Sequence, residues 1–167
     1  MNTHTMQVAS KVAKGFSLFL LIALFAGCVQ QNYKPTKTSV ELQAIQAKDF
    51  ETTKEVAFAS TMSTFQDLGY KVESANLATG FISAEGPTNE KFVLFVGQVM
   101  ETLKATAFVE SMGQNKAKIR LNFVNEMKSS SGYGMEGGND VPVEEPKFYQ
   151  DAFAKITKGI YLRESME

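Results

Sequence analysis

Residues 105–127, ATAFVESMGQNKAKIRLNFVNEM, decide the fold of this chain. After the turn residues Gly113-Gln114-Asn115, apolar and polar side chains alternate. The apolar set is Ala117, Ile119, Leu121 and Phe123, and the polar set between them is Lys118, Arg120 and Asn122. This alternation is typical of an antiparallel strand with one buried and one solvated face. The stretch therefore predicts a β-hairpin with strands at 105–112 and 116–127.

Further strands are predicted on the N-terminal side of this hairpin. Residues 70–73 (YKVE) and 81–84 (FISA) flank the turn-forming stretch 76–80 and predict a second hairpin. Residues 40–50 (VELQAIQAKDF) place apolar side chains at period two and predict a first strand. The very apolar stretch 92–103, which begins FVLFVGQVM, fits either a strand or one face of a helix, and its pattern leaves both open.

Two amphipathic helices complete the pattern. Thr52 and Glu55 have the spacing of a capping box, and the helix that follows is expected to end at Leu68, before Gly69. Its expected buried stripe is Val56, Ala59, Met62, Phe65 and Leu68. A final helix is predicted from about Pro146, because proline fits a first helical turn. Its expected buried stripe is Phe148, Ala152, Ile156 and Ile160. Residues 128–140 (KSSSGYGMEGGND) predict a loop.

The predicted order is strand, helix, four strands and helix. The predicted hairpins pair antiparallel, and each helix has to bury its apolar face on the sheet. We therefore expect one α+β domain over residues 40–167. It is expected to contain an antiparallel sheet of about five strands, with two helices packed on one face.

The N-terminal residues predict export and lipidation. Lys11 and Lys14 precede the apolar run 16–25, which is followed by Ala26, Gly27 and Cys28. That run is shorter than the roughly 20 residues needed to cross a bilayer. We interpret residues 1–27 as a signal peptide that is cleaved between Gly27 and Cys28, with a lipid on Cys28. The alternative is an ordinary signal peptide cut further along, which would release a soluble periplasmic protein.

The end of this segment resembles the bacterial lipobox, with Phe25 where leucine is usual. Val29 follows the cysteine, whereas aspartate there usually marks retention in the inner membrane. The resemblance therefore implies an outer-membrane lipoprotein on the periplasmic face. The polar residues 28–39 (CVQQNYKPTKTS) are expected to be a flexible tether between lipid and domain.

Composition excludes several function classes. Beyond residue 27 the chain has no histidine, and its single cysteine is Cys28. Zinc sites, Ser-His-Asp and Cys-His systems and disulfides need residues that are missing. A net charge of about −3 after cleavage gives no basic surface for nucleic acid. We expect no cofactor, no metal and no enzymatic activity, since the carboxylate pairs Asp49/Glu51 and Glu144/Glu145 lie at an expected turn and helix start.

Three stretches resemble a family of proteobacterial envelope lipoproteins. They are residues 64–70 (TFQDLGY), 80–84 (GFISA) and 148–156 (FYQDAFAKI). In that family one helix ends in L-Q-D-L/M-G-F/Y and the last contains Y-Q-x-F-F-x-K-L, so Phe65 and Ala152 are departures here. The organisation is also similar to the helix-grip domains of the lipoprotein accessory to outer-membrane β-barrel assembly. These likenesses imply a fold and assign no site residue.

Two stretches are candidate contact surfaces. The apolar stretch 92–103 either packs on the domain's own core or is exposed to a partner or a bilayer. The stretch 128–140 is either a solvated connector or a recognition loop. The candidate partner-binding residues are Phe92, Phe95, Val96, Val99, Tyr133 and Met135. We expect a lipid-anchored, non-catalytic interaction module that binds another envelope protein, with a carrier of a lipid or other apolar ligand as the alternative.

Overall fold

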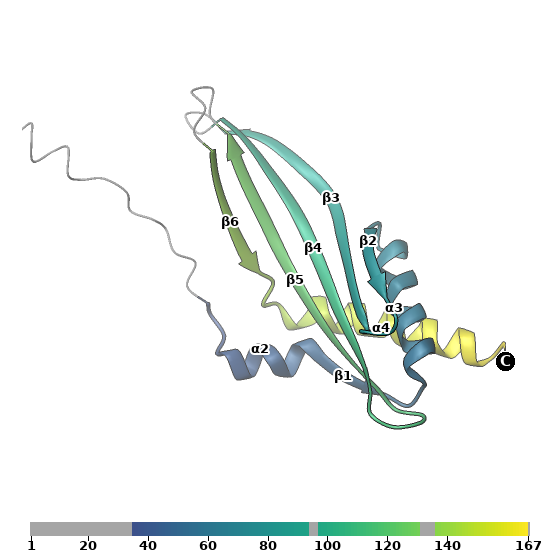
Figure 1. Ribbon diagram of the computed structural model, residues 1–167. Helices are drawn as coiled ribbons and strands as arrows, with labels where there is room; N and C mark the ends of the chain where they lie inside the picture. The colour runs from purple at the N-terminus through teal and green to yellow at the C-terminus, as the bar shows by residue number, and fades with distance from the viewer. Residues whose placement is uncertain (1–34, 94–96, 131–135, 167) are drawn as a thin grey trace, which may run out of the picture. The chain divides into compact units, whose positions relative to one another are not determined.

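The computed structural model describes residues 35–93, 97–130 and 136–166 (Figure 1). The signal peptide, Gly27, Cys28 and most of the predicted tether lie outside these ranges. From Pro35 onward the chain forms one compact unit. No helix in the described part is long and apolar enough to cross a membrane.

The predicted α+β class is confirmed, with one more strand and one more helix than expected. The helices are α2 (Ser39–Gln46), α3 (Lys54–Asp67) and α4 (Pro146–Glu164). The strands are β1 (Ala47–Phe50), β2 (Lys71–Asn76), β3 (Phe81–Val93), β4 (Gly97–Ser111), β5 (Ala117–Ser130) and β6 (Glu136–Pro142). The sheet order is β1-β5-β4-β3-β2, and β6 also pairs with β5. All these pairings are antiparallel.

Both predicted hairpins are present. The pairs Ser111↔Ala117 and Ala107↔Leu121 place the alternating residues of β5 in register with β4. The pair Asn76↔Phe81 closes the hairpin of β2 and β3. Ile119, Leu121 and Phe123 are completely buried, as their alternation predicted.

The stretch predicted as a first strand is mostly helical, so that prediction is wrong for residues 40–46. Thr38 and Glu41 form a capping box, in which the Glu41 carboxylate accepts a hydrogen bond from the Thr38 amide at 2.8 Å. The backbone and side-chain hydrogen bonds from Thr38 lower the pKa of Glu41. Satisfying two free amides at once favours a helix start over period-two alternation. Residues 35–39, which composition assigned to the tether, include the first residue of α2.

The start of α3 also differs from its prediction by one residue. The N-cap is Thr53, whose hydroxyl accepts a hydrogen bond from the Val56 amide at 3.3 Å. Thr52, the predicted capping residue, is 3% exposed, and its hydroxyl has no hydrogen-bond partner among the described residues. Only Thr52 has a glutamate three residues further on, but the helix begins at Lys54, so its cap is Thr53.

This difference gives a paired prediction. We expect Thr53→Ala to lower the free energy of unfolding by about 1 kcal/mol, because a helix amide loses its cap. Thr52→Val removes a buried hydroxyl without a partner, so it should leave that free energy unchanged or raise it by about 1 kcal/mol. Urea unfolding of both variants measures the difference. A larger loss for Thr52→Val than for Thr53→Ala would contradict the assignment of the cap.

The buried face of α3 is offset from the predicted stripe. Its buried residues are Ala57, Phe58, Ser60, Thr61, Thr64 and Phe65. Of the predicted stripe, Phe65 is fully buried, while Val56, Met62 and Leu68 are partly buried beside the core. A repeat of three residues drifts around a helix of 3.6 residues per turn, so the predicted stripe left out the buried Ser60, Thr61 and Thr64.

Helix α4 begins at Pro146, as predicted, and covers the sheet together with α3. Its buried residues are Tyr149, Ala152, Phe153, Ile156 and Ile160. Three of the four predicted positions are therefore buried, and Phe148 is partly buried. Tyr149 is completely buried because its hydroxyl donates a hydrogen bond to the Val143 carbonyl at 2.8 Å. A tyrosine hydroxyl that finds a partner can enter a core.

The long strands continue beyond the helices, and this decides where a site can lie. Residues 92–103, left open between helix and strand, belong to β3 and β4 apart from the undescribed 94–96. The predicted loop 128–140 is wrong for its described residues, because 128–130 belong to β5 and 136–140 to β6. Gly137 and Gly138 pair with Ser129 and Lys128, so their backbone extends the sheet where their composition predicted a loop. Figure 1 shows these strand ends projecting away from α3 and α4.

Candidate functional site

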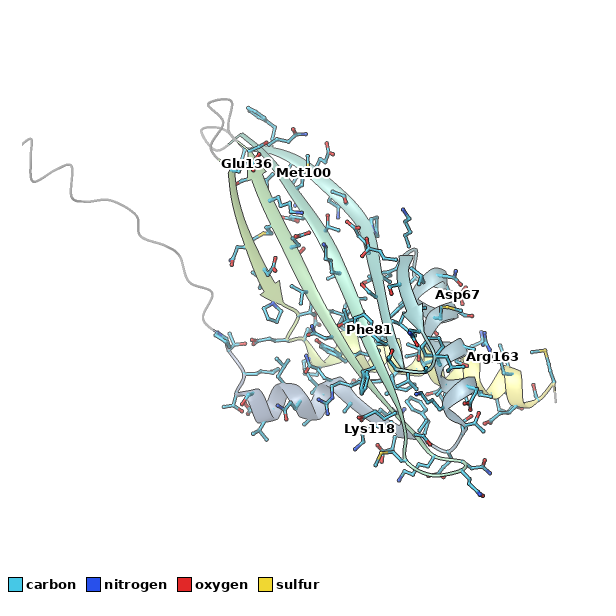
Figure 2. The ribbon with its side chains drawn as sticks, viewed as in Figure 1. Asp67, Phe81, Met100, Lys118, Glu136 and Arg163 are labelled. Carbon is cyan, nitrogen blue, oxygen red and sulfur yellow. The ribbon has the colours of Figure 1, made fainter. Side chains whose placement is uncertain are left out.

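The projecting part of the sheet is named the extension here. It consists of residues 88–93 of β3, 97–102 of β4, 124–130 of β5 and 136–142 of β6. Figure 2 shows Met100 and Glu136 at its far end, whereas Asp67 and Arg163 lie with the helices. The extension thus has a uniform construction: four paired strands without a helix on either face in the described part of the chain.

The extension unites the two stretches that the sequence singled out separately. The pairs Gln98↔Ser130 and Met100↔Lys128 join β4 to β5, and Ser130↔Glu136 joins β5 to β6. Residues 32 and 28 positions apart are thus paired in one sheet. No local pattern in either stretch indicated that the other lay beside it.

Two of the six predicted partner-binding residues, Phe92 and Val99, lie among the described residues. Phe92 is 79% exposed on β3, so it belongs to the surface and not to the core. Val99 is partly buried on β4. Phe95, Val96, Tyr133 and Met135 lie outside the described residues, and their predicted role stays a prediction.

One face of the extension carries a charged row, turned away from the helices. The Glu126 carboxylate lies 3.1 Å from the ammonium groups of both Lys104 and Lys128. Hydrogen bonds from these two lysines lower the pKa of Glu126. On the same face, the hydroxyls of Thr88 and Thr102 are 2.9 Å apart. These residues already satisfy one another, so this row offers a ligand few free polar groups.

The other face contains a groove of about 450 Å³, at the point where the helices end and the sheet continues. Its floor is formed by β3, β4 and β5, and its walls are the end of α3 and the start of α4. The lining residues are Leu68, Tyr70, Pro87, Asn89, Glu101, Leu103, Asn125, Val143 and Phe148. Apolar walls with a few polar groups on the floor are typical of binding sites.

Several polar side chains in this groove have no hydrogen-bond partner among the described residues. The Tyr70 hydroxyl and the carboxamides of Asn89 and Asn125 make no hydrogen bond within the part of the chain that the structure describes. Glu101 has one, at 3.4 Å from the Lys91 ammonium. Groups of this kind are available to a ligand, since a bound polar group would replace water and not an existing contact. The groove is therefore the candidate binding site.

The sequence did not predict this groove. Glu101 and Leu103 belong to the apolar stretch that was singled out, but Tyr70, Asn89 and Asn125 carried no signal of their own. Leu68 was expected at the buried end of a helix, and Tyr70 at the start of a predicted strand. The groove combines chain segments that only the pairing of β3, β4 and β5 brings together.

Tyr70 gives the groove a pH dependence that can be measured. Burial raises the pKa of Tyr70 to about 12. Because this exceeds the unfolded value near 10, the linked stability is complete below about pH 10 and is lost as the pH rises toward 12. Between pH 7 and pH 11, we expect the free energy of unfolding to fall by about 1 kcal/mol less for Tyr70→Phe than for the wild type. Urea unfolding at both pH values tests this, and equal losses would contradict it.

One member of each acidic pair considered in the sequence, Asp49 or Glu144, has a structural partner. Asp49 lies 3.2 Å from the Lys116 ammonium and 3.7 Å from that of Lys118. Glu144 accepts hydrogen bonds from the amides of Thr36 and Lys37, each at 3.0 Å, and so fixes the chain before α2. Within the described residues, no group of three or more His, Cys, Asp or Glu side chains is placed to hold a metal ion.

Comparisons with known proteins add little to this geometry. No protein-family model matches the chain, and no curated protein is significantly similar to it. Among solved structures, the chain is similar to a TBP-like protein from Parabacteroides distasonis ATCC 8503. The sequence identity is 13%, the TM-score is 0.36, and the match covers 69% of this chain and 90% of that chain.

Proposed function

We propose that this protein is a lipid-anchored interaction module of the bacterial envelope, held on the periplasmic face of the outer membrane. The observation that carries the proposal is the extension with its groove, whose apolar walls surround polar side chains that have no hydrogen-bond partner among the described residues. The lipobox-like segment at Cys28 supports the location. The lack of histidine after residue 27 supports a binding role over the common catalytic chemistries.

The lipid is tested first. We expect wild-type protein to incorporate an alkyne fatty acid and to fractionate with the outer membrane, and Cys28→Ala to lose both properties. A wild-type protein that takes up no label would contradict the anchoring and leave a periplasmic protein without a lipid.

The binding role is tested by crosslinking in cells. A photoreactive amino acid at Asn89 lies in the groove, whereas the same amino acid at Tyr161, which is 69% exposed on α4, lies away from it. We expect a discrete crosslinked protein from position 89 and none from position 161. Equal crosslinking from both positions would show that the contacts are nonspecific and would contradict a binding role of the groove.

A second candidate function is a carrier of a lipid or other apolar ligand, favoured by the volume and apolar walls of the same groove. Such a ligand would bind in the groove and not between helices and sheet, because Phe65, Phe123 and Tyr149 already fill that space. Native mass spectrometry of the purified protein distinguishes the candidates. A copurifying small molecule that is lost in Leu103→Trp, which narrows the groove, would support the carrier, and its repeated absence would count against it.

A further inference from the structure

The far end of the extension exposes apolar side chains. Phe92 and Val93, the last two residues of β3, are 79% and 42% exposed. They pair with Gln98 and Gly97, so they stand where the described sheet ends. Exposed apolar side chains that lie together mark a contact more often than isolated ones do.

Their orientation bears on what they contact. Successive residues of a strand point to opposite faces of the sheet, so Phe92 lies on one face and Val93 on the other. A protein that docks on one face would cover one of them. A bilayer surrounds an inserted end and covers both at once.

The end of the sheet also has little charge to desolvate. Its outermost described residues are Phe92, Val93, Gly97, Gln98, Ser130 and Glu136, and Glu136 is the one ionisable group in that set. The nearest ion pair on β3 joins Lys91, the residue before Phe92, to Glu101 at 3.4 Å. A charged pair this close to Phe92 limits the contact to the depth of the lipid headgroups, because deeper insertion would desolvate the pair.

The predicted lipid has the reach to share a membrane with this end. Glu144 holds the amides of Thr36 and Lys37, and the neighbouring Val143 amide donates to the Phe123 carbonyl. From Phe123 to Ser130, β5 covers seven residue steps, or about 23 Å. From Cys28 to Thr36 the chain has eight residue steps, which span up to about 26 Å. The lipid on Cys28 and the far end of the extension can therefore reach the same bilayer surface.

We propose that Phe92 and Val93 enter the interface of the bilayer that holds the lipid on Cys28, as a second attachment point. The geometry of this inference rests on the proposed lipidation. Two attachment points orient the domain, which a single tether does not. The groove, whose residue Asn125 lies five residues before Ser130 on β5, is then held about 17 Å from the membrane contact. At that height it faces proteins of the same membrane.

The absence of tryptophan from the chain makes the test direct. Phe92→Trp places a single indole at the end of the extension, and Tyr161→Trp places one on the exposed side of α4 as the control. Both proteins are reconstituted, with their lipid, in vesicles of phosphatidylethanolamine and phosphatidylglycerol. We expect the indole of F92W to emit at shorter wavelength and to be quenched by lipids brominated on their acyl chains. The indole of Y161W should keep the emission of a solvated group.

The same variants without lipid separate this inference from the lipoprotein proposal. In the mature chain with Cys28→Ser, the indole of F92W should still be quenched at high vesicle concentration. In the same lipid-free chain, Phe92→Ser should reduce flotation with vesicles at least about tenfold relative to the chain that keeps Phe92. A lipidated F92W that floats with vesicles but is not quenched would overturn the inference and leave the lipid anchor intact. Shielding of F92W by envelope proteins, without quenching by vesicles, would also overturn it and indicate a protein contact.

Discussion

Phe123→Ala is expected to lower the free energy of unfolding by about 3–5 kcal/mol, the largest effect of any single truncation considered for this domain. Phe123 is completely buried on β5, and four aromatic rings surround it. The ring centroids lie 4.8 Å away for Phe148, 5.4 Å for Tyr149, 6.1 Å for Phe65 and 6.3 Å for Tyr70. Alanine would leave a cavity between α3, α4 and the sheet that these rings cannot all fill.

The control is Phe108→Ala, which removes the same side chain from the opposite face of the sheet. Phe108 is 40% exposed, between the buried residues Ala107 and Val109 of β4. Its truncation should lower the free energy of unfolding by less than about 1 kcal/mol. Urea unfolding followed by circular dichroism measures both variants. Comparable losses for the two would mean that Phe123 does not organise the core.

Gly80→Ala is expected to lower the free energy of unfolding by about 2–4 kcal/mol, from two causes that act together. Gly80 has φ of +77°, where a side chain is strained. A Cβ atom there would also lie 2.0 Å from the Val109 carbonyl oxygen, and the Val109 amide donates to the Gly80 carbonyl at 2.8 Å. The strand pair β3–β4 would have to separate locally to accept a methyl group.

Gly69→Ala isolates the first of these causes. Gly69 follows α3 with φ of +83°, and apart from its chain neighbours no atom of the described residues lies within 4 Å of the position of an added Cβ. Its replacement should therefore cost about 1 kcal/mol, from backbone strain alone. The difference between the two alanine variants measures the close approach of Gly80 to β4. If the two losses are equal, that close approach does not contribute to stability.

How far local pattern predicts this fold depends on whether neighbouring residues or distant ones decide a feature. The alternation from Ala117 to Phe123 predicted one face of β5, because each side chain's orientation follows from its position in the strand. The start of α4 at Pro146 followed in the same way. The period-two pattern at residues 40–46 was overruled by the capping box of Thr38 and Glu41, a competing local signal of greater specificity.

The stretches 92–103 and 128–140 show where local pattern ends. One fitted a helix or a strand, and the other had the composition of a loop. Both are strands at their described residues because each pairs with β4 or β5, and such pairing supplies backbone hydrogen bonds that glycine and serine accept as readily as any residue. The decision lies in the partner strand, which is remote in sequence.

By itself the sequence determined the α+β class, both hairpins, the final helix and the alternating face of β5. It also predicts export and lipidation at Cys28. These depend on periods, turns and caps within a few residues. Only the tertiary structure decided that β3 to β6 outrun the helices and that Tyr70, Asn89 and Asn125 face one groove. The physical reason is that a groove is bounded by the ends of α3 and α4 and by the register of three strands, and no local pattern records where distant elements stop.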